Sequence, residues 1–226
     1  MRKMIFLAML LSLLPVTASG QQQKLQKRPY ADQKLFHLGF TVGINMQDLI
    51  LRQSGYVNEN GEVWFSEIPG YTPGFSAGII ADLYLNSFMN LRIIPTLHLG
   101  SKEPVFKEQA SGETFETAVR NNYITLPLQL KLRAVRINNY RPYLLTGPYG
   151  SIELAPRKNQ PVMLTPYDYG VEIGVGCDLY LPYFTLSPEL KFCFGLNQMV
   201  KANQSKYSQS LAGATHRMII LSFNFE

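Results

Sequence analysis

Charged residues and glycines share one alternating set of positions in several stretches of this sequence, and apolar residues occupy the other set. The stretch DYGVEIGVGCDLYLPYFTLSPELKF, residues 168–192, shows this most clearly, since its acids alternate with valine, isoleucine and leucine. Carboxylates on their own could act as general acids or bases, whereas carboxylates matched to basic groups form ion pairs. A near balance of acids and bases favours ion pairs here, and the residues concerned are Asp82, Arg92, Lys131, Arg133, Asp168, Glu172, Asp178, Glu189 and Lys191.

Nucleophilic chemistry has few candidates, because the sequence holds only 3 histidines. His98 with Ser101, or His216 with Ser210, could supply the base and nucleophile of a lipid hydrolase or acyltransferase. The plainer interpretation, which we favour, treats them as polar side chains of a lumen or a loop. The sequence has no phosphate-binding loop and no cysteine–histidine metal spacing. We therefore expect no enzyme activity, no cofactor, no metal ion and no small-molecule substrate.

The elements that must position these charges are strands, because apolar and polar residues alternate with a period of two. This pattern predicts an all-β chain without a long helix. Eight stretches have it, at residues 35–48, 74–86, 88–100, 121–137, 140–153, 167–181, 184–198 and 214–226.

The connections between these strands alternate between long and tight. Outer-membrane barrels have an even number of antiparallel strands, short periplasmic turns and longer outer loops. The sequence therefore predicts an eight-stranded antiparallel transmembrane β-barrel with short periplasmic turns and longer extracellular loops. The long connections are 49–73, 101–120, 154–166 and 199–213, and the tight ones lie at 86–88, 138–139 and 182–183.

The two faces of the strands predict which side meets lipid. One set of alternating positions is apolar in nearly every strand, and the complementary set carries the charges together with glycine. A water-facing surface needs no such balance of acids and bases, whereas the narrow lumen of an eight-stranded barrel encloses charges that must be paired. We therefore expect the apolar set to face lipid and the charges to fill the lumen. Aromatic residues expected in interfacial girdles are Phe36, Tyr143, Tyr149, Tyr183, Phe184 and Phe225.

Turn lengths predict the register of three hairpins. A turn at 182–183 places glycines opposite Glu189 and Lys191, and it makes Glu172 a diagonal neighbour of Lys191. A turn at 86–88 places Asp82 opposite Arg92. A type I′ turn at Asn138 and Asn139 sets Lys131 opposite Thr146.

Other features depend on the same register. Cys177 falls on the outer face and Cys193 on the inner face, so the two cannot join within disulfide geometry and we predict free thiols. Pro95, Pro127, Pro148 and Pro188 lie inside predicted strands, where each implies a bulge or a gap in the ladder.

The amino-terminal residues predict where the protein is located, and the net charge bears on its partners. A basic start, an apolar run and a small-residue site at Ala18–Gly20 predict a signal peptide over residues 1–20. Residues 21–34 are then a periplasmic segment and residues 35–226 the barrel, which places the protein in the bacterial outer membrane. The 21 basic residues only slightly exceed the 16 acidic ones, and this scattered excess indicates no nucleic acid partner.

Function should then lie in the loops or the outer wall, because inward arginine, lysine and tyrosine side chains leave no aqueous path. The interpretation that we favour is a salt-bridged plug without conduction. The first long loop holds the only tryptophan of the chain, and its aromatic residues either bind a partner or pack on the barrel rim. The residues concerned are Trp64, Phe65 and Tyr71.

Four stretches of the sequence together carry a family resemblance, namely FHLGFTVGINMQDL (36–49), NYITLPLQLKLR (122–133), RPYLLTGPYG (141–150) and SPELKFCFGLNQM (187–199). They resemble the PorT family, whose members are small outer-membrane β-barrels associated with the type IX secretion system. The portion from Tyr123 to Lys131 is also found in the broader group of eight-stranded porin-family barrels. One departure is the ending Phe225–Glu226, where many such proteins end on an aromatic residue.

The resemblance implies a role in exporting proteins with a C-terminal sorting domain across the outer membrane, and it implies no catalytic residues. Its expected partners are outer-membrane lipid and protein subunits of a larger translocon. Two alternatives stay open. One is a barrel for envelope stability or adhesion, and the other is a lipid-modifying enzyme that would depend on His98 or His216.

Overall fold

A computed structural model describes most of the region that was predicted to form strands. Residues 1–25, including the predicted signal peptide, and residues 54–63, 155–164 and 198–210 lie outside the described part, together with a few shorter gaps. The described residues are 26–53, 64–67, 72–102, 105–108, 114–116, 119–120, 122–154, 165–197 and 211–226.

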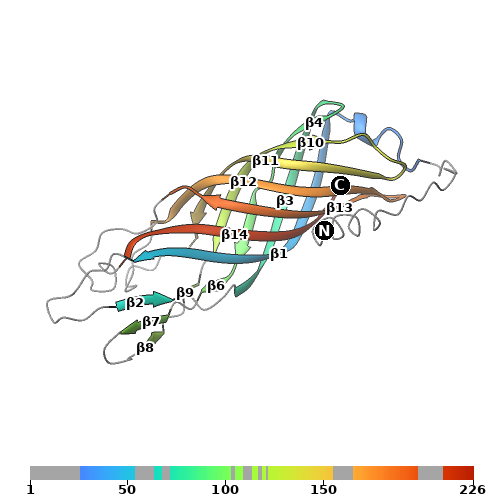
Figure 1. The fold of residues 1–226 in the computed structure, drawn as a ribbon. Coiled ribbons are helices and arrows are strands. Elements are labelled where there is room, and N and C mark those ends of the chain that lie inside the picture. Colours follow the sequence, from blue (N-terminus) through green and yellow to red (C-terminus); the bar gives the residue numbers. More distant parts are fainter. Residues whose placement is uncertain are drawn as a thin grey trace, which may run out of the picture.

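The described strands form a closed antiparallel barrel of eight strands, which confirms the predicted fold (Figure 1). The sheet runs in the order β1-β14-β13-β12-β11-β10-β4-β3, and β1 also pairs with β3 to close the cylinder. Two segments, β4 and β5, together make one of the eight strands. The bounds are β1 (Phe36–Gln53), β3 (Thr72–Asn86), β4 (Met89–Ile93), β5 (Thr96–Leu99), β10 (Tyr123–Arg133), β11 (Tyr140–Glu153), β12 (Tyr167–Tyr180), β13 (Thr185–Gly195) and β14 (Leu211–Phe225).

The sidedness of the barrel follows the predicted alternation. In β12, for example, the burial alternates residue by residue over most of the strand, with Asp168 and Glu172 buried and Val171 and Ile173 exposed. The interior therefore contains the polar set and the outer wall contains the apolar set. This sidedness is the reverse of that in a water-soluble barrel, because the large apolar surface faces outward. Of the described residues, no helix is long and apolar enough to cross a lipid bilayer.

Two of the three predicted hairpin registers are confirmed. β12 pairs with β13 so that Gly176 lies opposite Glu189 and Gly174 opposite Lys191. β3 pairs with β4 so that Asp82 lies opposite Arg92. The alternation and the turn lengths therefore sufficed to place these strands.

The third register is shifted by one residue, because Lys131 lies opposite Leu145 and not opposite Thr146. The tight turn itself is present, since Ile137 and Tyr140 form a bridge across it. Between this bridge and the pair formed by Arg133 and Tyr143, β10 has one residue more than β11. Such a bulge turns every later side chain of β11 to the opposite face.

The bulge corrects the prediction for two aromatic residues. Tyr143 and Tyr149 lie inside the barrel and are only 3% and 4% exposed, whereas both were expected in the outer girdles. Tyr149 packs there in a small apolar cluster with Cys193, Met218 and Ile220. The other girdle candidates, Phe36, Tyr183, Phe184 and Phe225, lie on the outside or at the rim.

Prolines and cysteines behave largely as the strand pattern predicted. Pro95 separates β4 from β5, which is the expected gap. Pro148 and Pro188 also lie in gaps, because the β10–β11 ladder has no pairs at Leu128 and Gln129 and the β12–β13 ladder has none at Cys177 and Asp178. Pro127 pairs with Tyr149, and the register is the same on either side of the gap. Both cysteines are free thiols, with Cys193 buried in the interior, so the prediction of no disulfide is confirmed.

The two ends of the barrel differ. The tight turns lie at one end, where a 3-10 helix, η1 (Ala31–Gln33), lies before β1. At the other end β1 continues to Gln53, beyond its predicted end at residue 48. Beyond that end lie two small sheets (Figure 1), formed by β2 (Trp64–Glu67), β7 (Val105–Glu108) and β8 (Thr114–Glu116), and by β6 (Ser101–Lys102) and β9 (Val119–Arg120).

Candidate functional site

The interior of the barrel holds all nine charged residues that the sequence singled out. They project from five of the barrel strands, and none of them is more than 5% exposed. Buried charges are tolerated only when they are paired or hydrogen-bonded. The residues are Asp82, Arg92, Lys131, Arg133, Asp168, Glu172, Asp178, Glu189 and Lys191.

Arg92 is the centre of the first cluster, because its guanidinium group meets three carboxylates. It donates to Asp82 at 3.1 Å, to Glu189 at 2.6 Å and to Glu226 at 2.8 Å. Asn90 donates a further hydrogen bond of 2.5 Å to Asp82. Three carboxylates for one arginine give this part of the lumen an excess of negative charge.

Lys131 lies beside this cluster and pairs with a further acid. Its ammonium group donates to Asp178 at 2.9 Å, and Ser187 donates to the same carboxylate oxygen at 2.6 Å. The ammonium group also lies 4.1 Å from the ring centroid of Tyr143, a cation–π distance. The Tyr143 hydroxyl donates to Glu189 at 2.6 Å and so joins the two clusters.

Glu172 and Lys191 are diagonal neighbours, as predicted, but their side chains form no ion pair. Lys191 lies 3.9 Å from Glu189 on its own strand. Glu172 instead accepts hydrogen bonds from Gln129 and, at 3.7 Å, from the thiol of Cys193. The prediction considered only the neighbouring strand, whereas in a narrow barrel Gln129 reaches Glu172 from β10.

The histidines nearest the long-loop end have partners other than those weighed for an enzyme. His98 Nδ1 lies 2.8 Å from Ser76 Oγ inside the barrel. His216 Nδ1 lies 3.5 Å from a carboxylate oxygen of Asp168. The side chain of Ser101 and all of Ser210 fall outside the described residues.

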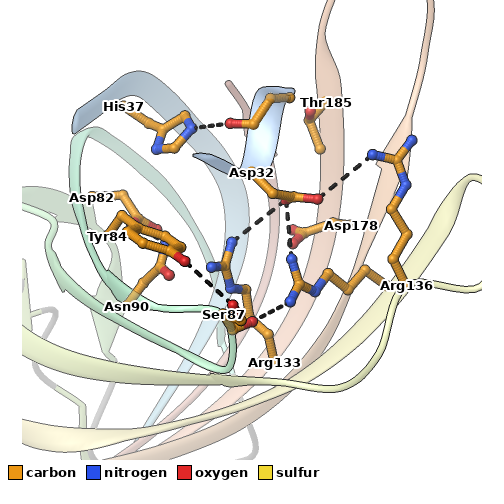
Figure 2. Close-up of polar contacts among 12 residues, drawn as sticks. Asp32, His37, Asp82, Tyr84, Ser87, Asn90, Arg133, Arg136, Asp178 and Thr185 are labelled. Atoms are coloured by element: carbon orange, nitrogen blue, oxygen red, sulfur yellow. Dashed lines mark hydrogen bonds and ion pairs between the residues drawn. The ribbon is translucent and has the colours of Figure 1, made fainter. Parts of the chain in front are cut away.

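The tight-turn end holds a site that the sequence reasoning missed. The carboxylate of Asp32, in η1, lies among three arginine side chains that come from the end of β10, its turn and the start of β11 (Figure 2). Tyr180 donates a hydrogen bond of 2.5 Å to the same carboxylate. The closest nitrogen–oxygen distances from Asp32 are 3.2 Å to Arg141, 3.5 Å to Arg133 and 3.5 Å to Arg136.

The charges around Asp32 set its pKa. Partial burial of the carboxyl group raises its pKa, but the Tyr180 hydrogen bond and the three guanidinium groups outweigh this, so the pKa lies below the ordinary value of 3.8. Asp32 is therefore ionised at neutral pH.

Other contacts fasten the segment around η1 over the barrel mouth. His37 donates to the carbonyl of Ala31 at 2.7 Å, and Ala31 is buried. Arg28 donates to Thr185 at 2.8 Å. A sequence signal did exist, because Asp32 is the only acid between residues 21 and 47, among several basic residues. Nothing in the periodicity, however, related it to arginines about a hundred positions away.

The aromatic loop proposed for partner binding is only partly described. Trp64 and Phe65 belong to β2, where they pair with Glu108 and Lys107 of β7. Tyr71 lies outside the described residues. A role of these residues in partner binding stays a prediction.

The outer wall carries three neighbouring apolar hollows across β10, β11, β12 and β13. Their volumes are about 610, 380 and 290 Å³. Val175 lines all three, and glycines at positions 174 and 176 contribute to them. The wall is therefore apolar but not smooth.

Comparison with known proteins gives a family and a set of similar folds. A family model described as "Outer membrane protein beta-barrel domain" matches residues 21–201. No curated protein matches the sequence.

Several solved structures are similar in fold at low sequence identity. OprG from Pseudomonas aeruginosa has 9% identity and a TM-score of 0.49, over 83% of this chain and 94% of that one. Neisserial surface protein A has 8% identity and a TM-score of 0.45, over 84% and 98%. AlkL, solved in lipid bilayers, has 10% identity and a TM-score of 0.44, over 92% and 93%.

Proposed function

The chain belongs to the outer membrane protein beta-barrel domain family, and from that premise we propose that it is a non-enzymatic accessory of type IX protein secretion. It is a small barrel of the bacterial outer membrane and lies in the lipid bilayer. In the proposed role it docks beside a larger translocon and assists the export of proteins with C-terminal sorting domains.

The observation that carries this proposal is the interior filled with paired charges. Arg92 is fully buried and joined to three carboxylates, and Lys131 and Tyr143 fill the neighbouring space. An exported protein cannot pass through a lumen that side chains occupy. A role in export would therefore use the outer wall or the loops, and the hollows across β10–β13 offer a surface for a neighbouring barrel.

The choice of the type IX secretion system in this proposal rests on the resemblance of four stretches to the PorT family. Gene deletion tests the proposal directly. The deletion strain should retain sorted proteins in the periplasm, and a plasmid copy should restore their display on the cell surface. Normal display in the deletion strain would reject the proposal.

The second candidate is a barrel for adhesion or envelope stability. It is favoured by the small sheet of β2, β7 and β8, which extends the long-loop end beyond the barrel. Replacing residues 54–71 by a short glycine–serine linker separates the two roles. Loss of cell adhesion with unchanged protein export would favour the second candidate.

A further inference from the structure

The three arginines at the tight-turn mouth are held in place by the barrel itself. Arg133 donates to the carbonyl of Asn86 at 3.3 Å, and Arg141 donates to the carbonyl of Ala134 at 2.9 Å. Arg136 donates to the carbonyl of Asn138 at 2.9 Å. All three acceptors lie in or beside the turns that join barrel strands. The guanidinium groups would therefore keep their positions if the segment around η1 moved away.

One carboxylate does not saturate this site. Among the described residues, Asp32 is the one carboxylate within ion-pair distance of the three arginines, although Asp82 and Asp178 also lie near Arg133. Its distances of 3.2–3.5 Å are longer than the 2.7–2.9 Å of strong charge-assisted hydrogen bonds. The Nε atom of Arg133 has no hydrogen-bond partner, although this side chain is only 3% exposed. A cavity of about 20 Å³ lies beside it and beneath Asp32, with room for about one water molecule. The arginines therefore have unused donors for a carboxylate that binds at shorter distances in a bidentate geometry.

The present occupant shows what kind of molecule the site accepts. Arg136 donates to the main-chain carbonyls of Lys27 and Arg28 as well as contacting Asp32. His37 donates to the carbonyl of Ala31, the small buried residue directly before Asp32. The barrel mouth thus contacts a carboxylate together with the main chain that carries it. This favours a peptide over a free anion.

We propose that Arg133, Arg136 and Arg141 form a receptor site for an acidic peptide segment of a periplasmic protein, which Asp32 fills in cis. The segment formed by residues 27–33 then acts as a tethered competitor. A partner gains access only where its own carboxylate replaces that of Asp32. Because the site is positively charged, it selects segments that carry a carboxylate at the place of Asp32, and it disfavours segments without one.

A fluorescent peptide with the sequence of residues 28–34, RPYADQK, tests the proposal. Its binding is measured by anisotropy against the full chain in maltoside micelles. The wild type should bind weakly, because a tethered competitor acts at a local concentration of about a millimolar or more. Asp32→Arg repels the segment from the arginines, so this variant should bind the peptide at least about tenfold more tightly. A peptide with asparagine in place of the acid should not bind.

Matched variants separate the site from general charge. In the Asp32→Arg background, Arg141→Ala should weaken peptide binding about tenfold, whereas Arg217→Ala, at an exposed arginine of β14, should leave it unchanged. Equal effects of the two alanine variants would overturn the proposal, as would equal binding of the asparagine peptide. Displacement of the peptide by inorganic phosphate at lower concentrations than by acetate would reassign the site to phosphate groups and overturn it as well.

The folded barrel migrates differently from the heat-denatured chain in a gel, and this confirms that each variant is folded. If Asp32→Arg does not fold, Asp32→Asn replaces it, because it removes the charge at nearly constant volume. Peptide binding no tighter than that of the wild type in either folded variant rejects the tethered competitor.

Discussion

At the scale of single residues, the interior is stable because each of its acids meets a donor. Asp82 and Glu189 share Arg92, Asp178 meets Lys131, and Glu172 meets Gln129. Replacing a whole buried ion pair by apolar side chains is often harmless, whereas removing one partner leaves a buried charge without compensation. The residue with most partners should therefore be the most sensitive one.

Arg92→Met should lower the free energy of unfolding by about 3–5 kcal/mol, because Asp82 and Glu189 would stay buried without their cation. Urea unfolding of the barrel in lipid vesicles measures the change. Arg217→Met is the control, since its side chain lies on the outer face of β14 and not in the lumen, and it should change the free energy of unfolding by less than about 1 kcal/mol. Equal losses in the two variants would contradict the central role of Arg92.

Asp32 predicts a pH dependence that is confined to the mouth of the barrel. Its pKa in the folded state lies below the ordinary value of 3.8, so its contribution to stability is complete above that value. The contribution is lost as the pH falls through the folded pKa. Amide signals of residues 27–33 in NMR spectra should therefore change below pH 3.8, and they should be insensitive to pH in Asp32→Asn. A transition centred above pH 3.8 would contradict the lowered pKa.

At the scale of elements, strand pairing depends on glycines where two backbones approach. A Cβ on Gly147 in β11 would overlap the carbonyl oxygen of Leu128 in the neighbouring strand, whereas a Cβ on Gly150 would meet nothing within 4 Å. The two glycines lie on the same strand and so form a matched pair.

Gly147→Ala should destabilise the barrel by about 1–3 kcal/mol, because the added methyl group forces β10 and β11 apart. Gly150→Ala should be neutral or slightly stabilising, since glycine weakens a strand interior. Urea midpoints of the two variants against the wild type measure the difference. A larger loss for Gly150→Ala would show that the contact at Gly147 does not limit the pairing.

The elements also show how far the sequence can be interpreted without coordinates. A period of two identifies the strands and their faces, because burial on one side leaves a direct trace in residue type. It fails at the bulge before Ile137, since one extra residue changes the register without changing the composition of either strand. The pairing of Asp32 with Arg141 was beyond reach, because it joins a segment before the barrel to a strand 109 positions later.

At the scale of the whole molecule, the closed cylinder separates an outer and an inner surface of different chemical character. The outside is apolar and indented, and the inside is filled by ion pairs around Arg92. Family membership places this cylinder in the outer membrane.

The filled interior predicts that the wild-type barrel gives no unitary current steps in planar lipid bilayers. Replacing both Arg92 and Glu189 by alanine removes two fully buried side chains from the centre of the lumen. This double variant should admit ions and give steps under the same voltage. Steps of similar size from the wild type would contradict a sealed lumen.

The seam of the cylinder joins β1 to β14, the two barrel strands farthest apart in sequence. The acids around Arg92 come from β3, from β13 and from Glu226 just after β14, so this ion cluster is complete only when the seam is closed. Contacts between such distant segments make folding slow and leave unpaired strands open to aggregation. The chain is therefore open to aggregation until β1 and β14 have met, so the last contact along the sequence is the one that protects it.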